Sequence, residues 1–114
     1  MSINYITNNF GHIATNAQYA KYMELERTRG RLYRDLYQTV AEMVDGDIYI
    51  VEQITEQYRL ADIDDMALID AIANASDNEY IIDINSDIMQ QFNTLQAQYC
   101  EQVIKIAQFK QNIQ

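Results

Sequence analysis

The sequence contains no proline and only three isolated glycines, Gly11, Gly30 and Gly46, in 114 residues. Folds built only from strands need many tight turns, which glycine and proline usually supply. Few, long elements are therefore expected, and in so short a chain long elements are helices. The apolar fraction of 48% is well above that of disordered chains. The sequence thus predicts one all-α helical bundle with a packed core.

Residues for reactive chemistry are also scarce, because the chain has a single cysteine, Cys100, and a single histidine, His12. Zinc sites, two-metal carboxylate bundles and nucleophile–histidine pairs all need more of these residues. Cys100 cannot form an internal disulfide, and within a strongly helical stretch it is interpreted as a small buried apolar residue. His12 is interpreted as a surface or packing residue. We therefore expect no enzyme, no catalytic residue, no metal and no cofactor.

The sequence does not favour a calcium site, a phosphate-binding loop or a membrane span, and capping or solvation better explains the acidic stretches. Asp83, Asn85 and Asp87 alternate as calcium ligands do, but the sixth and twelfth positions are Ile88 and Thr94 instead of glycine and glutamate. The isolated glycines cannot form a phosphate-binding loop. No apolar run approaches the roughly 18 residues that cross a bilayer, and no signal-peptide pattern is present. A cytoplasmic protein without a membrane partner is expected, or one located in the virion if the protein is viral.

The net charge of −9 is concentrated in the middle of the chain, because residues 45–87 hold 12 of the 17 acidic residues and one basic residue, Arg59. Direct nucleic acid binding is not expected, since it depends on clustered Lys and Arg. A protein partner with a basic surface is the natural complement. The candidate acidic surface is formed by Asp62, Asp64 and Asp65.

Residues 1–14 show no sustained period and are predicted to be an N-terminal arm, followed by a helical bundle domain at 15–114. Thr15 and Gln18 have the spacing of a capping box, and Gly46 supplies a left-handed end, so a long helix is predicted at about 16–45. Its apolar stripe contains Tyr22, Leu25, Leu32, Leu36, Val40 and Met43. The opposite face carries Arg27, Arg31 and Arg34, interpreted as solvated surface.

Two short helices are predicted next. The first, at about 47–60, places Ile50, Val51, Ile54 and Tyr58 at helical spacing, although the β-branched residues at 48–51 are also compatible with a strand. The second, at about 64–75, begins among carboxylates and buries Leu68, Ile69 and Ile72. Residues 79–84 are predicted to form either a short strand or the approach to the last helix.

The last helix, at about 86–113 and capped by Asn85 or Ser86, shows the clearest pattern. Apolar residues repeat every three or four positions, as in a coiled coil: Ile88, Phe92, Leu95, Tyr99, Gln102, Ile106, Phe109 and Ile113. Antiparallel packing on the first helix with Met43 beside Ile88 pairs Leu36 with Leu95, Leu32 with Tyr99, Leu25 with Ile106, and Arg29 with Gln102. Arg29 and Gln102 then form a polar layer that penalises slipped registers.

Tyrosine is the dominant aromatic residue, with nine in the chain. Tyr22, Tyr58 and Tyr99 are predicted to face the core, whereas Tyr49 points away from it. Tyr33 and Tyr37 flank the apolar stripe of the first helix. The stripe and its flanks exceed what one antiparallel helix covers, so the additional surface is covered either by the short helices or by a second copy of the chain, and we favour the second copy. Tyrosine is enriched at protein interfaces. The predicted interface residues are Tyr5, Phe10, Tyr33 and Tyr37.

Two hypotheses on function follow. The first is a non-enzymatic assembly or protein-interaction module that forms a homo-oligomer. Abundant Asn, Gln, Ile and Tyr with little Lys favour a viral accessory or virion protein. The alternative is an acidic inhibitor that mimics nucleic acid and occupies the basic groove of a partner protein.

Overall fold

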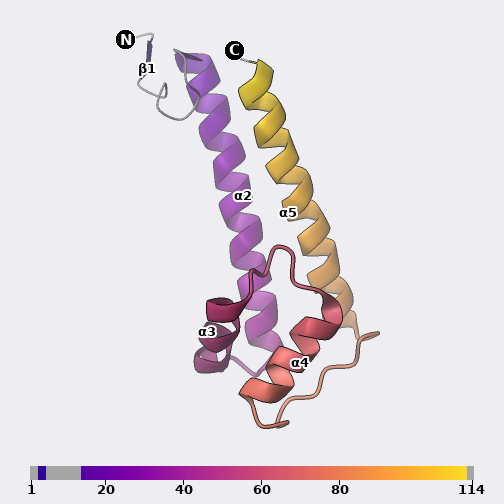
Figure 1. The fold of residues 1–114 in the computed structure, drawn as a ribbon. Helices are drawn as coiled ribbons and strands as arrows, with labels where there is room; N and C mark the ends of the chain where they lie inside the picture. Colours follow the sequence, from indigo (N-terminus) through magenta and orange to yellow (C-terminus); the bar gives the residue numbers. More distant parts are fainter. Residues whose placement is uncertain (1–2, 5–13, 113–114) are drawn as a thin grey trace. The chain divides into compact units, whose positions relative to one another are not determined.

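The computed structural model describes residues 3–4 and 14–112 (Figure 1). Its elements are β1 (Ile3–Asn4), β2 (Ala14–Thr15), α2 (Asn16–Met43), α3 (Ile48–Gln57), α4 (Asp65–Ala75) and α5 (Asp87–Asn112). β1 and β2 form a two-residue antiparallel pair. Within the described residues the remaining elements are two long helices and, between them in sequence, two short ones. The predicted all-α class is therefore confirmed.

The chain divides into two compact units, which we call unit 1 (Met1–Arg31 and Cys100–Gln114) and unit 2 (Leu32–Tyr99). Each long helix contributes a segment to both units. Unit 1 contains the beginning of α2 and the end of α5, whereas unit 2 contains the remainder of both helices together with α3 and α4. The two long helices pack antiparallel in each unit.

The ends of α2 follow the local sequence signals. The backbone N–H of Thr15 donates to Gln18 Oε1 at 2.8 Å, and the N–H of Gln18 donates to Thr15 Oγ1 at 3.1 Å, which confirms the predicted capping box. At the other end, Asp45 and Gly46 have φ values of 53° and 79°. The N–H of Gly46 donates to the Ala41 carbonyl at 2.7 Å, as in a Schellman motif. The left-handed end is thus confirmed, although the helix stops two residues earlier than predicted.

Short polar side chains also start the other helices. The Asp47 carboxylate accepts from two N–H groups at the start of α3, and the Asp64 carboxylate accepts from the Met66 N–H of α4. Ser86 Oγ accepts from the Met89 N–H of α5 at 3.3 Å, so Ser86 is the cap. Residues 48–51 are helical, which resolves that alternative. Residues 79–84 are neither strand nor helix.

Unit 2 contains the larger hydrophobic core. It is formed by buried residues of all four helices and their connections: Leu36, Val40, Met43, Val44, Ile50, Val51, Ile54, Leu60, Ile63, Leu68, Ile72, Met89 and Phe92. Ile69 is only half-buried. Tyr58 was predicted to face the core, but its side chain is 40% exposed. That prediction is wrong because Tyr58 follows the last residue of α3 in an extended conformation, where helical spacing no longer applies.

Unit 1 contains a much smaller core. Its buried hydrophobic residues are Tyr22 and Ile106, against which Tyr19, Leu25 and Phe109 pack. Tyr22 therefore faces the core as predicted, whereas Ile113 lies outside the described residues.

Side-chain pairs in each unit fit the predicted register to within one residue. In unit 2, Gln91 Nε2 donates to Thr39 Oγ1 at 3.5 Å, and the rings of Tyr33 and Tyr99 lie 6.0 Å apart. In unit 1, the Lys110 ammonium lies 5.7 Å from the centroid of the Tyr22 ring. The hydrophobic periodicity therefore predicted the alignment of the two helices correctly.

Candidate interaction surfaces

A groove of about 330 Å³ lies between α2 and α5 in unit 1. Its lining residues are Glu26, Arg29, Val103, Ile106, Ala107 and Lys110. Val103, which lines the groove, is 42% exposed, and the next residue, Ile104, which is not one of the lining residues, is 51% exposed. Met23, one helical turn before Glu26, is 39% exposed. Unit 1 thus combines a small core with an open apolar face.

Along α5, exposed residues in unit 1 follow at helical spacing from residues that are buried in unit 2. Met89 and Phe92 are fully buried there, and the spacings of three and four residues lead on to Cys100, Val103 and Ala107. These last three residues are exposed. The prediction that Cys100 is buried is therefore wrong, because the side of α5 that carries it is left uncovered within the described chain.

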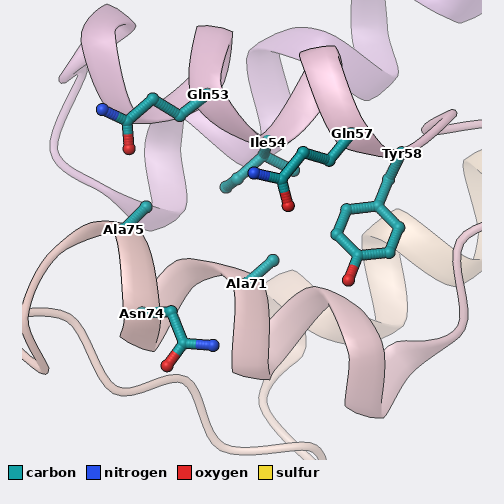
Figure 2. A pocket seen from close by; sticks show the side chains of 7 residues that line it. All are labelled: Gln53, Ile54, Gln57, Tyr58, Ala71, Asn74 and Ala75. Carbon is teal, nitrogen blue, oxygen red and sulfur yellow. The ribbon is translucent and has the colours of Figure 1, made fainter.

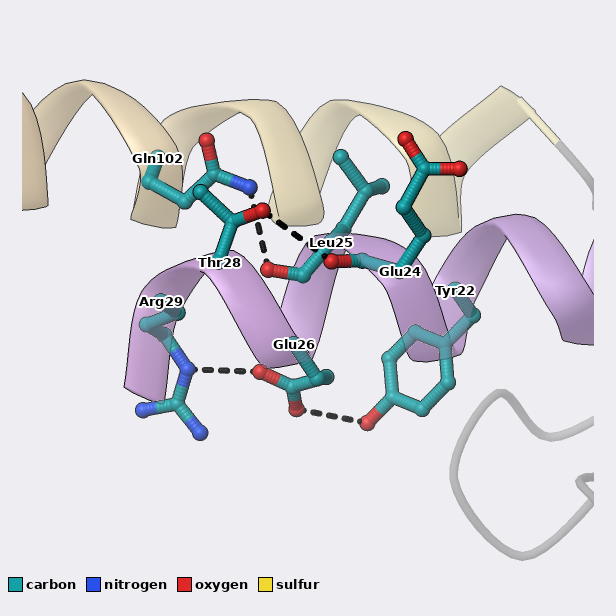
Figure 3. A network of polar contacts seen from close by, with 7 residues as sticks. All are labelled: Tyr22, Glu24, Leu25, Glu26, Thr28, Arg29 and Gln102. Carbon is teal, nitrogen blue, oxygen red and sulfur yellow. Dashed lines mark hydrogen bonds and ion pairs between the residues drawn. The ribbon is translucent and has the colours of Figure 1, made fainter. Parts of the chain in front are cut away.

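A polar network lies along α2 at this groove (Figure 3). The Tyr22 hydroxyl donates to Glu26 Oε2 at 2.8 Å, and Arg29 Nε donates to Glu26 Oε1 at 2.6 Å. Burial raises the pKa of Tyr22, and its hydrogen bond to Glu26 raises it further. Burial also acts to raise the pKa of Glu26, but the hydrogen bonds from Arg29 and Tyr22 outweigh it, so that pKa is lowered. The network holds a carboxylate in its charged form.

The predicted polar layer of Arg29 and Gln102 lies in the same unit. Gln102 is buried, and its Nε2 donates to the backbone carbonyl of Leu25 at 3.0 Å (Figure 3). In a regular helix that carbonyl is the acceptor for the N–H of Arg29, four residues later. Gln102 is thus bound to the backbone of α2, while the Arg29 side chain is paired with Glu26.

A second hollow, of about 190 Å³, lies between α3 and α4 in unit 2 (Figure 2). Apolar groups and uncharged polar side chains line it: Gln53, Ile54, Gln57, Tyr58, Ala71, Asn74 and Ala75. Carboxamide and phenol groups form hydrogen bonds with neutral partners. None of these side chains is a nucleophile with a neighbouring base. The geometry therefore offers a contact for a neutral group.

The predicted acidic residues all have local partners. Asp62 pairs with Arg59, and Asp64 caps α4. The Asp65 carboxylate accepts a hydrogen bond from Asn93 Nδ2 at 3.1 Å. Each of the three carboxylates therefore stabilises the fold of unit 2, whether or not a partner binds there.

The predicted aromatic interface residues differ in exposure. Tyr33 is 38% exposed, with its ring tilted against Tyr99. Tyr37 is half-buried against the core of unit 2, so only part of its surface is open to a partner. Tyr5 and Phe10 lie outside the described residues, as does His12.

Sequence reasoning missed the open side of unit 1, namely Met23, Val103 and Ile104. One apolar stripe was predicted for each long helix, and Met23, Val103 and Ile104 lie outside these stripes. The signal was present, because Val103 and Ile104 are adjacent β-branched residues outside the seam of a helix that is otherwise polar there.

Among the residues that the structure describes, no group of three or more His, Cys, Asp or Glu residues is placed to hold a metal ion. In the same part of the chain, no helix has the length and apolar character needed to span a membrane. No known protein family, curated protein or solved structure matches the chain.

Proposed function

We propose that the chain is a non-enzymatic, self-associating interaction module in which a second copy completes unit 1. The observation that carries this proposal is the contrast between the core of unit 1 and its exposed surface. Among the residues of unit 1 that the structure describes, Tyr22 and Ile106 are the only buried hydrophobic ones in its core. Met23, Val103 and Ile104, in the same unit, are each more than a third exposed.

The energetics of unit 1 support the need for a partner. Its helical segments have 16 residues in α2 and 13 in α5. Isolated helices of about 12–15 residues are marginal in water, and most helical stability in proteins comes from packing. Fully burying one large aliphatic or aromatic side chain contributes about 1.5–3 kcal/mol. Burial of the exposed apolar residues of unit 1 by a second copy therefore stabilises this unit substantially relative to what its small core contributes.

Exposed apolar patches mark protein–protein contacts in soluble proteins, and Val103 lines the groove of unit 1 together with Ile106 and Ala107. An oligomer that covers this surface explains why large hydrophobic residues lie outside the stripes along which α2 and α5 pack on each other. It also fits the tyrosine content, because Tyr33 is exposed in unit 2.

Sedimentation velocity over a range of protein concentrations tests this proposal. We expect a concentration-dependent oligomer, and we expect Val103→Asp to raise the dissociation constant at least tenfold, because it places a charge in an apolar contact. The matched control is Ile81→Asp, which makes a similar change at a side chain that is 79% exposed in unit 2. Far-ultraviolet dichroism checks that both variants remain helical. A wild-type protein that is monomeric at every concentration contradicts the proposal, as does a Val103→Asp variant that associates normally.

The acidic inhibitor is a second candidate, favoured by the charge of unit 2, which holds 14 acidic and two basic residues. Against it, Asp62, Asp64 and Asp65 each have a role within the fold. This candidate predicts salt-sensitive binding to basic nucleic-acid-binding proteins. Unchanged binding after all three are replaced by Asn would count against this region as the mimic.

A further inference from the structure

The two units carry side-chain charges of opposite sign. Unit 1 has six basic and three acidic residues, whereas unit 2 has two basic and 14 acidic residues. Complementary potentials select partners and fix their orientation. A second copy of this chain therefore offers unit 1 a surface of the sign that it attracts.

One row of α2 in unit 1 carries cations without partners. Met23, Arg27 and Arg31 are spaced four residues apart and are all exposed. Within the described residues, neither Arg27 nor Arg31 makes an ion pair or a side-chain hydrogen bond. The other described cations of unit 1 do have partners: Lys21 with Glu24, Arg29 with Glu26, Lys105 with Glu101, and Lys110 with the Tyr22 ring. We call Met23, Arg27 and Arg31 the α2 row.

One row of α3 in unit 2 has the same spacing and the opposite charge. Ile48, Glu52 and Glu56 are spaced four residues apart and are exposed. Neither glutamate side chain makes an ion pair or a hydrogen bond with the described residues. Ile48 is 47% exposed, and the adjacent Tyr49 is 70% exposed. We call Ile48, Glu52 and Glu56 the α3 row.

Gly30 leaves room for another helix beside the α2 row. A Cβ atom placed at Gly30 would meet nothing within 4 Å, so packing within the described chain does not require a glycine there. Glycine in a helix interior is destabilising relative to alanine. One use of such a residue is the close approach of a second backbone.

We propose that the α2 row of one copy docks on the α3 row of a second copy. This inference rests on the proposed self-association and adds a contact between α2 and α3 to the one proposed at Val103 of α5. With the two helices parallel, Met23 faces Ile48, Arg27 faces Glu52, and Arg31 faces Glu56. Successive pairs lie about 6 Å apart along the helix axes, which is slightly more than one helical turn. In a dimer with two-fold symmetry the contact forms twice, because each copy carries both rows.

Charge reversal tests the pairing of the rows. One variant carries Arg27→Glu and Arg31→Glu, and the other carries Glu52→Arg and Glu56→Arg. These side chains are exposed and unpaired, so we expect both variants to fold. Each variant alone faces like charges across both contacts, and we expect its dimer dissociation constant to rise at least tenfold. In an equimolar mixture both contacts regain opposite charges, and we expect the heterodimer to form within threefold of wild-type affinity.

The matched control carries Asp70→Arg and Glu79→Arg, which make the same change of charge at exposed residues outside the α3 row. We expect it to dimerise as the wild type does. A wild-type dimer that is insensitive to either row variant, or a mixture that fails to restore association although both variants are helical, overturns this pairing while self-association stands. A monomeric wild-type protein overturns both proposals.

Discussion

Units 1 and 2 contain segments of the same two long helices, yet their cores differ greatly. Counting described residues only, the core of unit 2 has 13 buried hydrophobic residues, whereas that of unit 1 has two. In unit 2, α3 and α4 cover the side of the helix pair that the main seam leaves open. In unit 1, Val103 of α5 lines an open groove and is 42% exposed. Two helices that meet along one seam therefore bury few side chains, and a third layer supplies most of the core.

Two glutamines of α5, the half-buried Gln96 and the buried Gln102, show the same difference. In unit 2, Gln96 Nε2 donates at 2.9 Å to each of two carbonyls, those of Leu60 and Ile63, in the connection between α3 and α4. In unit 1, Gln102 donates to the carbonyl of Leu25, which lies within a helix. Gln96 thus ties an irregular segment to α5, whereas Gln102 adds a second bond to a carbonyl of α2.

The largest expected effect comes from truncating the core of unit 2. Phe92 is fully buried, so Phe92→Ala leaves a large cavity and is expected to cost about 3–5 kcal/mol of unfolding free energy. Ile106→Ala in unit 1 is expected to cost about 2 kcal/mol, because its site opens on a groove that water can fill. Urea denaturation followed by dichroism measures both variants. Equal losses would contradict the difference between the cores.

The glutamines provide a second, smaller contrast. Gln96→Leu leaves the Leu60 and Ile63 carbonyls without their partner, and each orphaned buried group costs about 1–3 kcal/mol. We expect a loss of about 3 kcal/mol. Gln102→Leu keeps the helical bond of the Leu25 carbonyl and is expected to change stability by less than about 1 kcal/mol. A larger loss for Gln102→Leu than for Gln96→Leu would reverse this interpretation.

The smallest expected effect is the pH dependence of the network in unit 1. The folded-state pKa of Glu26 is lowered, so its contribution is present above the unfolded pKa of about 4.3 and is lost as the pH falls through the folded pKa. The side chains of Arg29 and Glu26 are 41% and 25% exposed, which limits the contribution to about 0.5–1 kcal/mol.

Glu26→Gln should therefore lower stability at pH 7, and the difference from wild type should shrink as the pH falls below about 4. Glu24→Gln is the control, because its ion pair with Lys21 is longer, at 3.7 Å, and exposed. Thermal unfolding from pH 3 to pH 7 measures both variants. A Glu26→Gln difference that is constant across this range would show that the carboxylate charge is not responsible.

The sequence was informative wherever a structural feature depends on nearby residues. The capping box of Thr15 and Gln18 and the cap at Ser86 are local signals, and the seam spacing predicted the helix alignment. Tyr58 and Cys100 were misplaced because their exposure depends on where a helix ends and on which side is covered. Neither property is encoded in helical periodicity alone.

The candidate surfaces were predicted less completely than the fold. Arg27 and Arg31 were interpreted as solvated, and the structure does expose them. Their significance depends on having no partner within the described chain and on the matching row of α3, and both require three-dimensional information. The acidic residues Asp62, Asp64 and Asp65 drew attention by charge, but their local contacts are visible only in the folded structure.

Hydrogen exchange at several protein concentrations tests most directly whether a second copy completes unit 1. At low concentration, we expect the amides of α2 up to Arg31 and of α5 from Cys100 to exchange much faster than those in the core of unit 2. As the concentration rises, protection in unit 1 should increase with the fraction of dimer, while protection in unit 2 changes little. Slow exchange in unit 1 that is the same at every concentration would show that its two helices are stable without a partner, and would contradict the account.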